Sequence, residues 1–142
     1  MKDLKSLIIL FKAHTSVNNI VKKSLEDTGL SVNEFAAMEA LYHKGALSTQ
    51  SLIDHVLIPN SSMTYVLDVL KKKEYIERSK DPKDKRIQRI QLTDEGISTF
   101  ETVYKIHFES MRKVFDVLSE DEENMLQESL KKIGKFAQGV KS

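Results

Sequence analysis

The feature of this sequence that most restricts its fold is a pair of short helical patterns followed at once by a charged hairpin. Ser48 is placed to cap the first pattern, and the chain breaks at residues 57–60 before the apolar spacing resumes as far as Leu70. Residues 75–80 and 86–92 are typical of strands, and the segment between them is rich in turn-forming and charged residues. We therefore expect two helices that meet at a tight turn and, beside them, a β-hairpin with a charged tip.

Helical patterns also occupy the N-terminal part of the chain. Apolar residues recur at helical spacing over residues 4–25 and stop before Gly29, a residue suited to the left-handed end of a helix. Ser31 and Glu34 form a capping box, which opens a second helix that runs to Gly45. These patterns predict one long and one shorter helix ahead of the tight turn.

Two more helices are predicted after the hairpin. Thr93 can cap a long one, and Ser119 with Glu122 forms a second capping box that opens the last one. The terminal helical patterns are too apolar for isolated helices, so they pack together within one chain or between two chains, and a dimer is the simpler interpretation. The expected fold class is mainly α with a small β-hairpin wing.

Length and composition are those of an ordinary globular protein. The 142 residues suffice for one main core, and no apolar run approaches the roughly 20 residues that span a bilayer. The N-terminal segment lacks the cleavage site of a signal peptide, and a chain without cysteine has no disulfide, thiolate metal ligand or thiol redox switch. We therefore expect a cytoplasmic protein with no membrane partner.

Charge is unevenly distributed along the chain, although the net value is only +1. Residues 71–89 contain nine Lys and Arg against four Asp and Glu, whereas residues 116–128 contain six acidic residues and no basic one. A polyanion is therefore expected to bind the middle of the chain.

A helix, a tight turn, a second helix and a basic hairpin form an arrangement that reads DNA. In such arrangements the N-terminal residues of the second helix face base edges in the major groove. The corresponding residues of this chain are small or polar, namely Asn60, Ser61, Ser62, Thr64 and Tyr65. The alternative is that the Asn and Ser residues only cap a surface helix.

Basic residues gather at the tip of the predicted hairpin. Lys83, Lys85 and Arg86 are expected to reach an adjacent minor groove, whose negative potential attracts a guanidinium. Asp84 lies two residues from Arg86, the main candidate, and is expected to orient its guanidinium through a charge-assisted hydrogen bond. The alternative is a solvated turn whose charges only keep the hairpin soluble.

The segment from Asp84 to Gly96, DKRIQRIQLTDEG, contains Asp-x-Arg followed by Leu-Thr-x-x-Gly. It resembles the wing of the MarR (multiple antibiotic resistance regulator) family of winged helix-turn-helix transcription regulators. Residues 62–73, SMTYVLDVLKKK, are similar to the recognition helix of that family, and the order of helices extends the resemblance over nearly the whole chain. One departure is Glu74, where many members have a glycine in the turn after the recognition helix.

The resemblance implies an obligate homodimer that reads a palindromic site in double-stranded DNA. Residues 1–30 and 97–142 are implied to form a helical dimerisation region, and residues 31–96 a winged helix-turn-helix DNA-binding lobe. Arg86 is implied as the minor-groove contact and Asp84 as its support. The residues implied at the groove-facing start of the recognition helix are Ser61, Ser62, Thr64 and Tyr65, and those implied near phosphates are Ser48, Thr49 and Gln50.

Members of the family commonly release DNA when a small, often aromatic or phenolic, molecule binds between the two regions. We therefore expect a repressor that such an effector releases. Candidates to line the effector cleft in this chain are Phe11, His14, Phe35, Met38, Tyr42 and Tyr104. The alternative is that these residues, which lie at helical spacing, are plain core.

Three other functions are alternatives. A zinc-responsive regulator of the same fold would draw its ligands from a poorly spaced set without a His-x-x-x-His pair: His14, His43, His55, His107, Glu34 and Glu39. An enzyme would be expected to carry a phosphate-binding glycine loop, a nucleophile elbow or a paired metal motif, and none is present in the sequence. A protein-interaction adaptor would keep the winged fold without binding DNA, although the basic hairpin tip argues against it. No metal or cofactor is expected.

Overall fold

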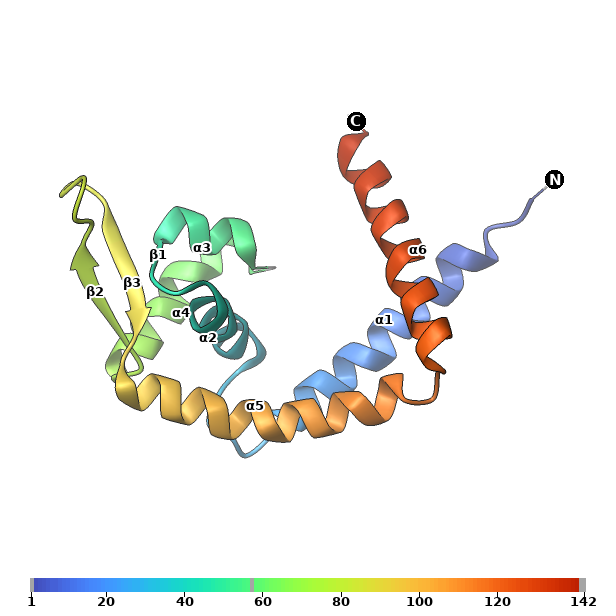
Figure 1. Ribbon diagram of the computed structural model, residues 1–142, viewed down its shortest axis with the longest axis horizontal. Helices are drawn as coiled ribbons and strands as arrows, with labels where there is room; N and C mark the ends of the chain where they lie inside the picture. Colours follow the sequence, from blue (N-terminus) through green and yellow to red (C-terminus); the bar gives the residue numbers. More distant parts are fainter. Residues whose placement is uncertain (1, 57, 141–142) are drawn as a thin grey trace.

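A lobe of short helices and a small sheet lies at one end of the molecule, and long helices diverge at the other (Figure 1). The computed structural model describes residues 2–56 and 58–140. Its elements, in chain order, are α1 (Lys5–Ser24), α2 (Val32–Lys44), β1 (Leu47–Ser48), α3 (Thr49–His55), α4 (Asn60–Lys72), β2 (Ile76–Lys80), β3 (Gln88–Leu92), α5 (Asp94–Phe115) and α6 (Glu120–Gly139). The predicted class, mainly α with a small β wing, is confirmed.

Four of the helices begin at the capping residues expected from the sequence. In each, a hydroxyl oxygen accepts a hydrogen bond from the backbone N–H three residues further on, which satisfies one of the donors that a helix start leaves unpaired. The capping residues are Ser31, Ser48, Thr93 and Ser119. In α2 and α6 the side chains of Glu34 and Glu122 in turn accept a hydrogen bond from the backbone N–H of the capping serine. Both predicted capping boxes are therefore confirmed.

The sheet contains a third strand that the sequence patterns did not predict. β3 lies in the middle, paired antiparallel with β2 on one side and with the two-residue strand β1 on the other. Leu47 of β1 pairs with Ile90, and Ile76 of β2 pairs with Leu92. β1 is too short to produce a strand pattern of its own, because its extended backbone depends on pairing with a strand far along the chain.

The hydrophobic core lies in the lobe. Phe35 of α2 and Phe100 of α5 stack with their ring centroids 5.3 Å apart. The remaining core side chains come from the end of α1, from α2 to α4, from the sheet and from the first turns of α5, and among the described residues none lies beyond Val103. Among all the helices in residues 2–56 and 58–140, none combines the length and the apolarity needed to cross a membrane.

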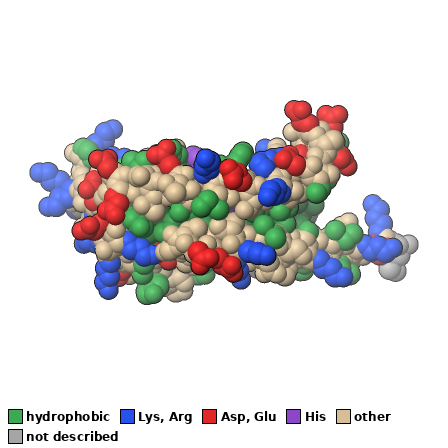
Figure 2. Space-filling model, turned by 90° about the horizontal axis from the view of Figure 1, so that it is seen from below, with side chains coloured by type: hydrophobic (Ala, Val, Ile, Leu, Met, Phe, Trp, Pro, Cys, Tyr) green, Lys and Arg blue, Asp and Glu red, His purple; other side chains and the backbone are tan. Residues whose placement is uncertain are grey.

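The helices outside the lobe leave apolar side chains uncovered. α6 buries none of its described residues, and Met125, Ile133 and Phe136 on it are 63%, 53% and 76% exposed. On α1, Ile9 and Phe11 are 65% and 63% exposed. Figure 2 shows hydrophobic side chains at the surface along the length of one face. An apolar surface of this extent is typical of helices that pack against another chain.

Thr93 and Gly96 join the wing to α5 and to the end of α4. The Thr93 hydroxyl donates a hydrogen bond to the carbonyl oxygen of Glu74 at 2.6 Å and accepts one from the N–H of Gly96 at 3.0 Å. The Thr93 N–H donates to the carbonyl oxygen of Tyr75 at 3.0 Å. A Cβ on Gly96 would lie 2.1 Å from that same Tyr75 oxygen. The Leu-Thr-x-x-Gly segment is thus explained by the close contact between α5 and the turn after α4.

Glu74 occupies the turn at which this chain departs from the resemblance, and its φ of 64° lies in the left-handed region. Glycine adopts this region freely, whereas a residue with a Cβ is strained there, so Glu74→Gly is expected to raise the free energy of unfolding by about 0.5–1 kcal/mol. Urea unfolding followed by circular dichroism measures the change. Glu74→Ala is the control, because it removes the side chain and keeps the Cβ; an equal gain in both variants would contradict the backbone explanation.

Candidate DNA interface

α4 presents a polar face to solvent on the side opposite its core contacts. Its buried residues recur at helical spacing, and the exposed positions between them include Ser61, Thr64 and Tyr65, whose side chain is 72% exposed. Ser62 is half-buried at the edge of this face. Asn60 opens α4, but its side chain lies outside the described part of the structure. The other four residues predicted to face a groove therefore share one side of α4.

The start of α3 combines one capping residue with two exposed polar ones. The Ser48 hydroxyl accepts a hydrogen bond from the N–H of Ser51 at 3.1 Å and lies 3.0 Å from the Ser51 hydroxyl. Thr49 and Gln50 are exposed in the first turn, and the Gln50 amide donates to the Asp54 carboxylate at 3.1 Å. The Ser48 hydroxyl is thus used within the helix, and a phosphate contact by any of these residues stays a prediction.

Aspartate side chains shape the tip of the wing between β2 and β3. One carboxylate oxygen of Asp81 accepts hydrogen bonds from the backbone N–H groups of Lys83 at 2.8 Å and of Asp84 at 3.1 Å. Such a turn, held by its own side chains, has a defined backbone conformation. Lys83, Lys85 and Arg86 are all exposed on it.

Asp84 holds the guanidinium of Arg86 in a two-point contact. One Asp84 oxygen accepts hydrogen bonds from Nε of Arg86 at 3.1 Å and from its backbone N–H at 3.0 Å, and the other accepts from Nη2 at 3.1 Å. These bonds lower the pKa of the Asp84 carboxyl and raise the pKa of Arg86. The contact expected from the sequence is present. Because the Arg86 side chain is 90% exposed, the result is an oriented guanidinium that faces solvent.

Two arginines on the strands connect the wing to other parts of the lobe, and the sequence patterns did not single them out. Arg89 of β3 donates a hydrogen bond to the carbonyl oxygen of Ala46 at 3.2 Å, just before β1. Arg78 of β2 lies 3.9 Å from the Asp68 carboxylate of α4. Both belong to the basic segment visible in the sequence, but their partners lie on other elements. In Figure 2, Lys and Arg side chains project from the end of the molecule that carries the wing.

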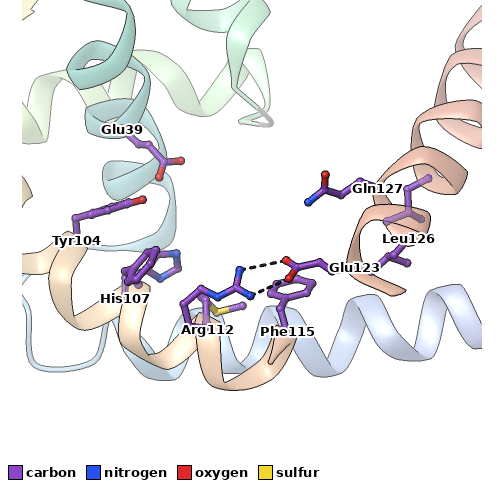
Figure 3. Close-up of a pocket in the computed structure, with 11 residues that line it drawn as sticks. Glu39, Tyr104, His107, Arg112, Phe115, Glu123, Leu126 and Gln127 are labelled. Atoms are coloured by element: carbon purple, nitrogen blue, oxygen red, sulfur yellow. Dashed lines mark hydrogen bonds and ion pairs between the residues drawn. The ribbon is translucent and has the colours of Figure 1, made fainter. Parts of the chain in front are cut away.

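Two of the hollows along α5 share the side chain of Tyr104. The first, of about 440 Å³, is in the elbow between α5 and α6, where Arg112 donates hydrogen bonds to the Glu123 carboxylate at 2.8 and 3.1 Å (Figure 3). The second, of about 360 Å³, is lined mainly by aromatic side chains, among them Tyr42 of α2 and Tyr104 of α5. Tyr104 belongs to both hollows, so they are adjacent along the helix.

The six residues predicted to line an effector cleft lie in three different places. Tyr42 and Tyr104 line the second hollow. Phe35 and Met38 are buried in the core, in agreement with the alternative interpretation. Phe11 and His14 are exposed on α1. Helical spacing identifies the apolar side of each helix, but which part of that side is covered depends on how the helices pack.

His107 lies in the first hollow, where three helices meet. Its ring centroid is 4.8 Å from that of Phe35, and its Nδ1 is 3.0 Å from the Ser24 hydroxyl. Burial lowers the pKa of His107, against the opposite influence of the Glu39 carboxylate, and so favours the neutral imidazole. Among the residues that the structure describes, no three His, Cys, Asp or Glu side chains are grouped so that they could hold a metal ion.

Sequence similarity to known proteins extends over nearly the whole chain. The MarR family model matches residues 30–88. The HTH-type transcriptional regulator MhqR of Bacillus subtilis is 38% identical over 133 residues, which cover 94% of this chain and 92% of MhqR. The chain belongs to the MarR family. This MarR-family protein is also 30% identical over 139 residues to the HTH-type transcriptional regulator PecS of Dickeya dadantii, with 94% of this chain and 84% of PecS covered.

Solved structures agree with the fold of this MarR-family protein. BpsR of Bordetella bronchiseptica, whose structure concerns the regulation of its DNA binding by 6-hydroxynicotinic acid, has a TM-score of 0.79 at 23% identity and covers 89% of this chain and 90% of its own. A mutant of the Escherichia coli MarR protein complexed with operator DNA has a TM-score of 0.77 at 21% identity, with 94% and 99% covered. The MarR-family protein is thus a transcription regulator with a winged helix-turn-helix fold.

Proposed function

We propose that this MarR-family regulator binds a palindromic site in double-stranded DNA as a homodimer. The observation that carries the proposal is the Arg86 guanidinium, oriented by Asp84 at the tip of a wing and exposed to solvent. An oriented arginine fits a minor groove, and a helix with small polar side chains fits the adjacent major groove. The residues that contact DNA in this proposal are Ser48, Thr49, Gln50, Asn60, Ser61, Ser62, Thr64, Tyr65, Lys83, Lys85 and Arg86.

The uncovered apolar side chains of α1 and α6 support the homodimer. Side chains such as Ile9, Met125 and Phe136 are mostly exposed in the single chain, and packing against a second copy removes them from water. In this proposal residues 1–30 and 97–142 form the dimerisation region, and residues 31–96 form the DNA-binding lobe. Each dimer then carries two lobes for two half-sites about one helical turn apart.

The aromatic hollow beside α5 supports an aromatic or phenolic effector. Tyr42, Phe100, Tyr104 and Phe108 line it, and aromatic rings pack favourably in offset or edge-on geometry. DNA binding by the structurally similar BpsR is regulated by 6-hydroxynicotinic acid, which is itself aromatic. An effector bound there changes the distance between the two lobes and so lowers the affinity for a two-half-site operator. The regulator is therefore a repressor that its effector releases.

We also infer that the protein acts in the cytoplasm and is not an enzyme. A transcription regulator acts where the DNA is, and the relatives MhqR and PecS are both named as transcriptional regulators. The polar groups of the wing and of α4 are arranged to bind rather than to react, because they face solvent instead of a closed pocket.

Fluorescence-anisotropy titration of DNA from upstream of the protein's own reading frame tests the proposal. We expect tight binding. The logarithm of the association constant is expected to fall linearly with the logarithm of the salt concentration, because DNA releases counterions when its phosphates are contacted. A footprint with two-fold symmetry is expected from a dimer. If no candidate duplex binds even at low salt, the protein-interaction adaptor becomes the better interpretation.

Asp84→Asn is expected to weaken DNA binding by about 3- to 10-fold, because the two-point contact with Arg86 is lost and the guanidinium becomes less ordered. Simple electrostatics predicts the opposite sign, since the variant loses a negative charge near a polyanion. Glu77→Gln on β2 is the matched control, because it removes the same charge from an exposed position without touching Arg86. Tighter binding by both variants would show that Asp84 does not position Arg86.

A further inference from the structure

Lys73 joins the end of α4 to a segment about 40 residues earlier in the sequence. It follows directly after α4, as its C-terminal capping residue. Its Nζ donates hydrogen bonds to the carbonyl oxygen of Gly29 at 2.6 Å and to Oε1 of Glu34 at 2.5 Å. Gly29 belongs to the connection between α1 and α2, and Glu34 lies in the first turn of α2. One ammonium group therefore links the end of α4 to the connection between α1 and α2 and to the first turn of α2.

The pair is better fixed than an ordinary surface ion pair. The side chains of Lys73 and Glu34 are only 34% and 13% exposed. The other Glu34 oxygen accepts a hydrogen bond from the N–H of Ser31 at 3.2 Å, so the carboxylate is held from two sides. Burial by itself raises the pKa of Glu34, but the hydrogen bonds from Lys73 and Ser31 outweigh it and the net shift is downward. The ionised form of Glu34 is thus favoured in this pair.

This contact supplements the other connections between the lobe and the long helices. α5 runs without interruption from the wing to the elbow with α6 (Figure 1). Leu25 and Leu30 add apolar packing where the chain enters the lobe. A lobe attached to the long helices through α5 alone can rotate about a hinge. A second polar attachment at a distance from α5 restricts that rotation. The hydrogen bond from Lys73 to Gly29 makes that second attachment at the end of α4, and the ion pair with Glu34, which lies within the lobe, holds the ammonium group in place.

We propose that Lys73 is a positioning residue that fixes the direction of α4 relative to α1. In the dimer this contact sets the distance between the two copies of α4 and so the half-site spacing that the protein accepts; this second step rests on the proposed function. Lys73 itself touches no base in this proposal and acts through Gly29 and Glu34.

A distance measurement between α1 and α4 tests the first step without DNA. Because the chain has no cysteine, Lys12→Cys and Ser61→Cys together create the two attachment points for spin labels. Subunit exchange with a large excess of unlabelled protein leaves the distance within one chain as the signal. We expect Lys73→Met to broaden the distance distribution at least about twofold, and Lys73→Arg, which keeps the charge, to restore most of its sharpness.

Two further variants separate positioning from general loss of stability. Glu34→Gln breaks the same ion pair from the other side and is expected to broaden the distribution as well. Lys71→Met removes an exposed lysine from the same end of α4 and is expected to leave it unchanged. Circular dichroism establishes the folded fraction of each variant. Equal widths for the wild type and the folded Lys73→Met and Glu34→Gln variants overturn the proposal.

DNA binding tests the second step. Affinities are compared for an operator with the natural half-site spacing and for one with a single base pair inserted between the half-sites. The wild type is expected to prefer the natural spacing, and Lys73→Met is expected to reduce that preference at least about fivefold, whereas Lys71→Met lowers both affinities equally. If Lys73→Met broadens the distance distribution but leaves the preference for the natural half-site spacing unchanged, the role of Lys73 in DNA reading is wrong. A broadened distance distribution in a protein that binds no operator supports the positioning role of Lys73 and refutes the proposed function instead.

Discussion

Replacing Arg86 with alanine is expected to weaken operator binding by about 10- to 100-fold, the largest loss from any single change in the wing. The guanidinium is 90% exposed and already oriented by Asp84, so its removal leaves the fold intact and deletes a preorganised cation. Unfolding in urea should therefore be unchanged. Fluorescence anisotropy over a salt series measures the loss. The slope of the logarithm of the association constant against the logarithm of salt concentration is expected to become shallower by about 1, which corresponds to one phosphate contact fewer.

Lys85→Ala and Arg86→Lys are the controls for this result. Lys85 is exposed beside Arg86 and carries the same charge, so its loss measures the general electrostatic contribution of the wing tip. Arg86→Lys keeps the charge but loses the planar fork that Asp84 holds, so it should recover only part of the affinity. If Lys85→Ala costs as much as Arg86→Ala, the specific role of Arg86 is wrong and the wing is only a cationic surface.

Gly96→Ala is expected to lower the free energy of unfolding by about 2–3 kcal/mol, because the added methyl group overlaps the backbone. A Cβ at this position would lie 2.1 Å from the carbonyl oxygen of Tyr75 and 2.9 Å from its carbonyl carbon. These are backbone atoms, and the same carbonyl accepts the Thr93 N–H, so neither can move without disturbing the joint between α4, the wing and α5. Helix propensity alone would favour alanine here by about 1 kcal/mol.

Gly134→Ala is the matched control, since Gly134 also lies within a helix and a Cβ there meets no atom of the chain within 4 Å. It is expected to raise the free energy of unfolding by about 0.5–1 kcal/mol. Both variants are measured by urea unfolding at one protein concentration. Equal effects of the two substitutions would contradict the steric explanation for Gly96.

Local chemistry explains which parts of the fold could be predicted from the sequence. Ser31 and Ser119 cap helices through donors only three residues away, so the capping boxes were visible in the sequence itself. The contact between Asp84 and Arg86 spans two residues and was predictable for the same reason. The class of the fold followed from the order of these local signals.

Contacts between distant segments could not be predicted in this way. β1 depends on Leu47 meeting Ile90, and no pattern of two residues encodes that pairing. The hydrogen bonds from Lys73 to Gly29 and Glu34 join residues 44 and 39 positions apart. For the effector cleft, periodicity identified aromatic residues on α2 and α5 but not which of them the packing leaves at a surface. The roles of the DNA-contacting residues likewise stay predictions until the complex is measured.

The length of α5 has a mechanical consequence for a protein that must fit two grooves at once. Its 22 residues make a lever about 33 Å long, with the wing joint at Asp94 on one end and the Arg112 elbow near the other. A tilt of about 5° at the elbow therefore moves the wing end by about 3 Å. That displacement is close to the roughly 3.4 Å rise of one base pair, so a small rotation at the elbow shifts the wing by nearly one base pair relative to its half-site.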